Sequence, residues 1–189
     1  MEQDLPIKNR WYLFSFIVLA FGAGWIWYSR NPAQEASRDA KALPRAGFYA
    51  PDFTLQTLGG DTITLSDLRG QAVIINLWAS WCPPCKAEMP ALQRVYEEYS
   101  SAGMTILAVN ATIQDDLNAA DQFVQENGLS FPVLLDTDGR VSRSYELRSL
   151  PTTFFVDPDG IIQEVVVGGP MAEALLHVRV QRLLGEGQP

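Results

Sequence analysis

Histidine and cysteine are scarce in this 189-residue chain, which contains one histidine and two cysteines. The histidine, His177, falls in a C-terminal helical pattern and is interpreted as a surface or packing residue. One histidine leaves almost no room for a Ser-His-Asp or Cys-His catalytic site. A structural zinc site needs about four ligands, usually two cysteine pairs or one pair with histidines. One cysteine pair does not meet that need, so we expect no metal and no cofactor.

Basic residues are outnumbered, with 14 Lys and Arg against 22 Asp and Glu, which gives a net charge of −8. A protein with a net negative charge repels the phosphate backbone of nucleic acids, so nucleic acid is not an expected partner. Hydrophobic residues make up 47% of the chain, which is enough for a real core. The length suits one domain of about 140 residues with an N-terminal extension.

The N-terminal extension contains an uncharged stretch, residues 11–29, between Arg10 and Arg30. As a helix it spans about 28 Å, roughly one bilayer core, and Trp and Tyr stand at both of its ends. The alternative is a cleaved signal peptide, whose apolar region is normally shorter and ends in a small-residue cleavage site. Bulky aromatic residues fill that place here, which favours an uncleaved anchor. The predicted organisation is a short tail at 1–10, a transmembrane signal-anchor helix at 11–29, a linker at 30–47 and a folded domain at 48–189.

The two cysteines, Cys82 and Cys85, stand between a predicted buried strand at 72–78 and a predicted amphipathic helix at 86–99. A Cys-x-x-Cys at such a junction is typical of a redox dithiol. Cysteines at the start of a helix lie one turn apart and can close a disulfide. The free N–H groups and the positive end of the helix stabilise a thiolate on Cys82, and the thiolate is the form that attacks disulfides. A purely structural disulfide is the alternative, although so small a loop removes little unfolded-state entropy.

The rest of the chain predicts an α/β sandwich with a mixed sheet. We expect a strand hairpin around Gly59 and a second hairpin across Pro158, and Pro90 is expected to kink the first long helix. The further predicted strands lie at 50–58, 62–65, 105–110, 131–135, 152–157 and 161–167, and the further helices at 66–69, 115–127, 138–145 and 171–184.

Together these features resemble the thioredoxin superfamily, and within it the membrane-anchored extracytoplasmic thiol-disulfide oxidoreductases of the TlpA/ResA type. The matching segments, in order within residues 48–184, are 50–53 (APDF), 76–85 (NLWASWCPPC), 88–90 (EMP), 131–134 (FPVL) and 150–154 (LPTTF). The resemblance implies a thioredoxin-like fold, in which a central mixed sheet is flanked by helices. It also implies a monomeric, single-pass protein of the cytoplasmic membrane with its domain outside. The basic residues on both sides of 11–29 do not by themselves favour a cytoplasmic N-terminus.

The resemblance to the TlpA/ResA type assigns an expected role to each residue around the cysteines. Cys82 is expected to be the exposed nucleophile, and Cys85 the more buried resolving thiol. Pro83 and Pro84, which have no N–H, restrict the turn and tune the redox potential. Trp81 is either a substrate-binding residue that covers the sulfurs or a half-buried packing residue.

Glu88 follows Cys85 by one helical turn, so it can take a proton from that thiol or return one. A partly buried carboxyl group has the raised pKa that this task needs. The alternative is a solvated first-turn glutamate that interacts favourably with the helix dipole. The resemblance favours the catalytic role. Thioredoxins carry a buried aspartate where this chain has Asn76, which cannot titrate, so Glu88 is the only nearby candidate.

Leu150 and Pro151 form the other half of the predicted site. The resemblance makes Pro151 a cis-proline that faces the dithiol. A cis bond there would expose the backbone of Leu150, with which an extended substrate segment could pair.

The resemblance implies an enzyme that reduces disulfides of client proteins, with apocytochrome c as the leading client in cytochrome c-type biogenesis. A membrane thiol transporter of the CcdA/DsbD type would be the electron donor. A peroxiredoxin-type peroxidase is one alternative, but that chemistry wants Thr or Ser three residues before Cys82, where this chain has Ala79. A copper-binding assembly chaperone is another, but such proteins use a wider cysteine pair and a distal histidine.

Overall fold

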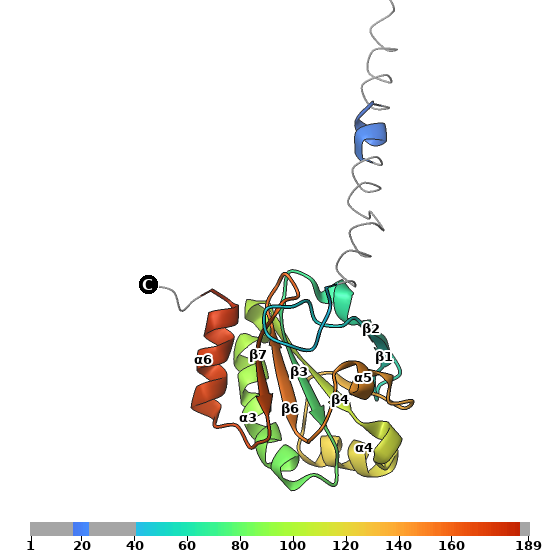
Figure 1. Ribbon diagram of the computed structural model, residues 1–189, viewed down its shortest axis with the longest axis vertical. Helices are drawn as coiled ribbons and strands as arrows, with labels where there is room; N and C mark the ends of the chain where they lie inside the picture. The colour runs from blue at the N-terminus through green and yellow to red at the C-terminus, as the bar shows by residue number, and fades with distance from the viewer. Residues whose placement is uncertain (1–16, 23–40, 186–189) are drawn as a thin grey trace, which may run out of the picture. The chain divides into compact units, whose positions relative to one another are not determined.

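The computed structural model describes residues 17–22 and 41–185 (Figure 1). Residues 17–22 are helical, and the folded unit begins at residue 41. The predicted tail at 1–10 and most of the predicted anchor at 11–29 lie outside the described residues, as does the linker up to residue 40. Over the described ranges, no helix is long and apolar enough to cross a bilayer.

A five-stranded mixed sheet forms the centre of the folded unit, with strand order β5-β4-β3-β6-β7. Strand β3 (Ala72–Trp78) pairs in parallel with β4 (Met104–Asn110) and antiparallel with β6 (Thr152–Val156). Strand β5 (Val133–Leu135) extends the parallel side, and β7 (Ile162–Val167) extends the antiparallel side. The predicted mixed sheet is therefore confirmed, with the strand before the cysteines at its centre.

A small hairpin and the segment before it complete the strand structure. Strands β1 (Thr54–Gln56) and β2 (Thr62–Thr64) pair antiparallel, as predicted, and the 3₁₀ turn η1 (Leu65–Leu68) follows. The end of the predicted linker, residues 41–47, belongs to the folded unit, because the Gly47 N–H donates to a β7 carbonyl over 2.8 Å. The folded unit therefore begins before the predicted domain start at residue 48, because the polar composition of the segment hides backbone pairing.

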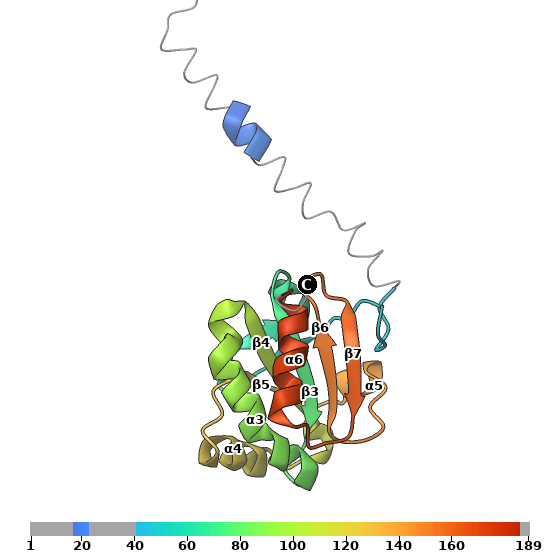
Figure 2. The ribbon, with the colours of Figure 1, turned by 90° about the vertical axis from the view of Figure 1, so that its left-hand side faces the viewer.

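Helices cover both faces of the sheet (Figure 2). Helices α3 and α6 pack on one face, and the short α5 lies on the other, as Figures 1 and 2 together show. Most predicted helix ends differ by one or two residues from those observed, within the usual uncertainty of helix boundaries. The helices are α3 (Pro83–Tyr99), α4 (Leu117–Glu126), α5 (Arg140–Ser144) and α6 (Glu173–Leu183), with 3₁₀ turns η2 (Ser100–Ala102) and η3 (Thr112–Gln114).

Strand β3 separates the core into two parts, because successive side chains of a strand point to opposite faces. Val73, Ile75 and Leu77 enter the cluster on the α5 side, whereas Ile74 and Trp78 enter the cluster beneath α3 and α6. All residues of β3 are buried, as its apolar sequence predicts. Asn76 shares the face of Ile74 and Trp78, so a polar side chain is buried under α3.

Candidate active site

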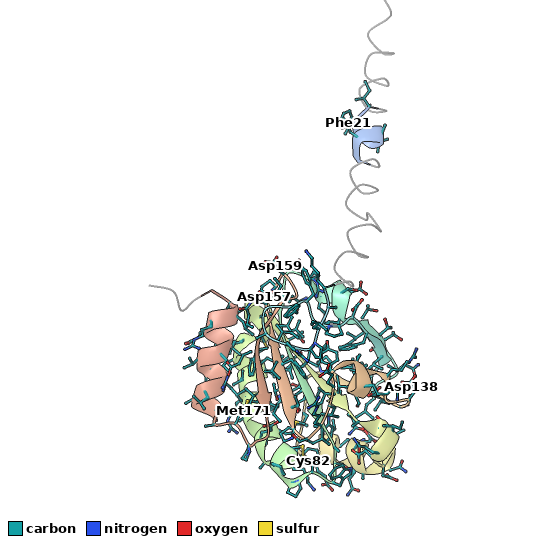
Figure 3. The ribbon with its side chains drawn as sticks, in the orientation of Figure 1. Phe21, Cys82, Asp138, Asp157, Asp159 and Met171 are labelled. Carbon is teal, nitrogen blue, oxygen red and sulfur yellow. A yellow bond between two sulfur atoms is a disulfide. The ribbon has the colours of Figure 1, made fainter. Side chains whose placement is uncertain are left out.

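The two cysteines form a disulfide where β3 leads into α3, with an S–S distance of 2.06 Å. Figure 3 places Cys82 and Met171 at one end of the domain, opposite the turn that carries Asp157 and Asp159. Cys82 is 3% exposed and Cys85 is fully buried. Cys82 is slightly more exposed than Cys85, but it is far less exposed than predicted, because it packs within the core cluster beneath α3 and α6.

Helix α3 begins at Pro83, three residues before the predicted start at Lys86. Proline fits the first turn of a helix, because the first N–H groups have no partner within the helix. Cys82 is the N-cap residue, and Pro83 and Pro84 remove the next two N–H donors. The Cys85 N–H points at the Cys82 sulfur over 3.3 Å. A donor so placed stabilises negative charge on that sulfur once the disulfide is reduced.

Trp81 is 57% exposed beside the disulfide. Its indole N–H donates to the Gln114 carbonyl of η3 over 3.0 Å. Both interpretations of Trp81 therefore stay predictions, because the indole contacts η3 while just over half of the residue is exposed. The indole N–H faces η3, and part of the ring surface remains exposed to solvent.

Asp115, just after η3, holds the loop that leads to Cys82. Its carboxylate accepts the N–H and the hydroxyl of Ser80, each over 2.6 Å. It also accepts the Asn110 amide over 2.6 Å and the Asp116 N–H over 2.9 Å. Sequence reasoning missed this contact, since 35 positions separate Ser80 from Asp115 and no motif joins them.

Glu88 lies on the buried face of α3, is fully buried and accepts two hydrogen bonds. The Asn76 side-chain amide donates to its Oε1 over 2.7 Å, and the Met171 N–H donates to its Oε2 over 3.3 Å. Burial raises the pKa of the Glu88 carboxyl group, while these hydrogen bonds from Asn76 and Met171 pull the pKa down by a smaller amount. The interpretation of Glu88 as a solvated first-turn residue is therefore wrong. A buried carboxyl group with a raised pKa suits proton transfer.

The Leu150–Pro151 peptide bond is cis, as the resemblance predicts. Pro151 is buried, and its carbonyl accepts the Gly168 N–H over 2.8 Å. Within residues 41–185, the backbone N–H and C=O of Leu150 make no hydrogen bond. Those two groups therefore have no partner among residues 41–185, and their pairing with an extended peptide stays a prediction.

A second cis peptide bond, Gly169–Pro170, lies in the loop after β7, and sequence reasoning missed it. The Gly169-Pro170 pair is the only sequence feature that could have indicated this cis bond. A Cβ atom placed on Gly169 would stand 2.7 Å from Glu88 Oε2 and 2.8 Å from Pro151 Cγ. Only glycine fits such a close approach. The loop backbone therefore packs against both Glu88 and Pro151, and it brings these two predicted residues into one site.

Across the described ranges, no group of three or more His, Cys, Asp or Glu side chains could hold a metal ion. The site therefore consists of a disulfide at a helix N-terminus, a buried carboxyl group and a cis-proline loop, on a sheet flanked by helices. These features define the class of dithiol oxidoreductases with a thioredoxin-like fold.

Comparisons with known proteins agree with this class. Residues 46–165 match the AhpC/TSA family. The thiol-disulfide oxidoreductase ResA of Oceanobacillus iheyensis is 42% identical over 135 residues, which are 69% of each chain. ResA of Halalkalibacterium halodurans is 37% identical over 171 residues, covering 90% of this chain and 92% of that one. The crystal structure of a putative thiol:disulfide interchange protein DsbE from Chlorobium tepidum has a TM-score of 0.70 at 31% identity, covering 76% of this chain and all of that one.

The chain belongs to the AhpC/TSA family and, within the thioredoxin superfamily, is a TlpA/ResA-like thiol-disulfide oxidoreductase.

The contacts of Asp115 generate a first prediction. In Asp115→Asn, the new NH₂ group must face donors that now point at a carboxylate oxygen. We expect the free energy of unfolding of the oxidised protein to fall by about 1–3 kcal/mol, measured by denaturant titration. Asp116→Asn is the matched control, because Asn can replace Asp116 as the N-cap of α4, and it should change stability by under about 0.5 kcal/mol. Equal losses in the two variants would contradict the role of Asp115.

The burial of Glu88 generates a second prediction. Its pKa is raised in the folded state, so the stability that the protonated carboxyl group contributes is present at low pH and is lost as pH rises through the folded pKa. Glu88→Gln cannot ionise, so its unfolding free energy relative to the native protein should increase as pH rises above 4.5, the ordinary pKa value. Thermal or denaturant unfolding of the oxidised protein across pH measures this. Glu97→Gln, on the exposed side of α3, is the control, and a flat difference for Glu88→Gln would refute the raised pKa.

Proposed function

We propose that this protein is a membrane-anchored, extracytoplasmic reductase of protein disulfides that works through the Cys82/Cys85 dithiol. The observation that carries the proposal is the disulfide at the start of α3 with a buried, raised-pKa Glu88 one turn further along that helix. The N-cap of α3 then supplies the nucleophile, and the helix supplies the resolving thiol and the proton carrier.

The reaction balances as two thiol-disulfide exchanges. The Cys82 thiolate attacks one sulfur of a client disulfide, and the other client sulfur leaves as a thiolate. Glu88 then accepts the proton of Cys85, and the Cys85 thiolate attacks the Cys82 sulfur of the mixed disulfide. The Cys82–Cys85 bond forms, the bond from Cys82 to the client breaks, and the second client sulfur leaves with its electron pair. The client gains two electrons, and the enzyme ends as the disulfide.

The client would be held by main-chain pairing and an aromatic contact. The free backbone groups of Leu150 can pair with an extended segment that carries the client cysteine. The exposed Trp81 ring offers apolar surface on the Cys82 side. Both features suit a protein client rather than a small molecule.

The finer assignment follows the TlpA/ResA resemblance. We propose apocytochrome c as a client, in cytochrome c maturation, and a CcdA/DsbD-type membrane thiol transporter as the donor that reduces the Cys82–Cys85 bond again. The segment at 11–29 would anchor a monomer with its domain on the extracytoplasmic side. The relatives are named thiol-disulfide oxidoreductase or thiol:disulfide interchange protein, which supports the exchange chemistry.

Substitution of each cysteine tests the order of attack. Reduced Cys85→Ser should form a stable mixed disulfide with a disulfide-containing peptide, because the resolving thiol is absent. Cys82→Ser should form none within the same time, because Cys85 is fully buried. Non-reducing electrophoresis and mass spectrometry measure both adducts. Adduct formation by Cys82→Ser at the rate of Cys85→Ser would reverse the assignment.

The reduction potential of the Cys82–Cys85 couple tests the direction of electron flow. We expect a value near or below about −250 mV, toward thioredoxin, in thiol redox buffers with thiol trapping as the readout. A value near about −120 mV would make the protein an oxidant and would exclude the reductase assignment. Consumption of hydrogen peroxide, followed in the same preparation, would instead support the peroxidase alternative.

A further inference from the structure

Strand β3 carries one polar amide in an otherwise apolar sequence, and that amide, Asn76, is fully buried. Asn76 lies on the same face of β3 as Ile74 and Trp78, and that face packs against α3. Glu88 is one of the buried residues of this helix. A buried amide is costly unless it is hydrogen-bonded. An apolar residue at this position would satisfy the core equally well, so the packing of the strand does not explain Asn76.

The contacts of Asn76 are few and directed. Its Nδ2 donates to Glu88 Oε1 over 2.7 Å and to the Thr153 hydroxyl over 2.9 Å. Thr153 is the cross-strand neighbour of Asn76 on β6, two residues after Pro151, and is 1% exposed. The Asn76 Oδ1 atom is buried and has no hydrogen-bond partner among the described residues. Both hydrogens of the Asn76 amide are therefore hydrogen-bonded, whereas its buried oxygen makes no hydrogen bond with the described residues.

These contacts make the two oxygens of Glu88 different. Oε1 receives the Asn76 amide, so a proton on that oxygen would compete with an N–H donor already in place. Oε2 receives only the longer contact from Met171 and lies beside Gly169 and Pro151. The proton of the neutral acid is therefore favoured on Oε2, on the side of the cis-proline loop.

We propose that Asn76 is a positioning residue that anchors Oε1 of Glu88 and thereby keeps the exchangeable proton on Oε2, on the side of the cis-proline loop. This inference rests on the proposed acid-base role of Glu88 and adds the residue that directs it. Thr153 holds the amide from β6, so the orientation of Glu88 is tied to the strand that follows Pro151. The same hydrogen bond from Asn76 also stabilises the charged form of Glu88 against burial.

The other groups around Glu88 do not carry charge. Asn76 faces it from β3, and Gly169 and Met171 face it from the loop after β7, with Pro151 beside that loop. Cys85, one turn earlier on α3, becomes titratable only when the disulfide is reduced. Within residues 41–185, burial and the hydrogen bonds from Asn76 and Met171 are the influences on the Glu88 pKa, and no charged side chain contributes.

Asn76→Leu tests the proposal, because it removes the donor and keeps the approximate volume. The pKa of the Glu88 carboxyl group, followed by carbon NMR in the oxidised protein, should rise by about one to two units. The pH midpoint for resolution of the mixed disulfide should move upward with it. Asn76→Asp is the second variant, and it places a second carboxyl group beside Glu88. The higher of the two pKa values of this coupled pair should lie above the pKa of Glu88 in the native protein.

Two controls separate positioning from a structural effect. Thr153→Val removes the other partner of the Asn76 amide and leaves the hydrogen bond to Glu88, so its shift should be clearly smaller than that of Asn76→Leu. In Glu88→Gln, the further change Asn76→Leu should not move the pH profile, because the titrating group is gone. A shift in that double variant, or an unchanged Glu88 pKa in both Asn76 variants, would overturn the proposal.

The two proposals fail in different ways. If Glu88→Gln resolves the mixed disulfide at the native rate and with the native pH profile, then the acid-base role of Glu88 is wrong. A raised Glu88 pKa in Asn76→Leu would still support the anchoring of Oε1 by Asn76. If Glu88→Gln is impaired but Asn76→Leu leaves the Glu88 pKa and the pH midpoint at their native values, only the role of Asn76 is refuted.

Discussion

The packing of α3 against the fully buried β3 is the constraint on which the rest of this structure depends. Because β3 is covered on both faces, every side chain on it meets another element, and the buried stripe of α3 fills the face shared by Ile74, Asn76 and Trp78. This packing fixes where α3 begins, and so it fixes where Cys82 and Cys85 lie. A polar side chain between β3 and α3 is shielded from water, so its hydrogen-bond partner has to come from the protein. The Asn76 amide donates to Glu88 there.

The start of α3 combines two local effects that act on the same sulfur. Pro83 and Pro84 allow the helix to begin early and remove two N–H donors, so the Cys85 N–H is directed at the Cys82 sulfur. The positive end of the helix adds to that donor. A thiolate is thereby stabilised at the helix end, while Glu88 stays within the apolar layer one turn further on. The N-cap of α3 thus supplies the nucleophile, and the helix itself supplies the proton carrier.

Loops from distant parts of the chain complete the site. The segment at η3 holds the approach to Cys82 through Asp115 and Gln114. The loop after β7 brings Gly169 and Met171 onto Glu88. Burial of Glu88 raises the pKa of its carboxyl group, and the Met171 N–H from the loop after β7 lowers that pKa by a smaller amount. The chemistry of the site therefore depends on loops that carry no catalytic group.

The sequence by itself determined the redox motif, the central strand at 72–78 and the mixed sheet. Apolar runs and cysteine spacing are local patterns, and they are enough to predict a buried strand and a cysteine pair one helical turn apart. The cis bond at Pro151 also followed from the resemblance. Only the tertiary structure decided that Glu88 is buried, because its spacing from Cys85 fits an exposed first turn equally well. The links from Asn76 to Glu88, from Asp115 to Ser80 and from Gly169 to Pro151 join positions far apart in the chain. Such contacts depend on how the elements pack, and no local pattern records them.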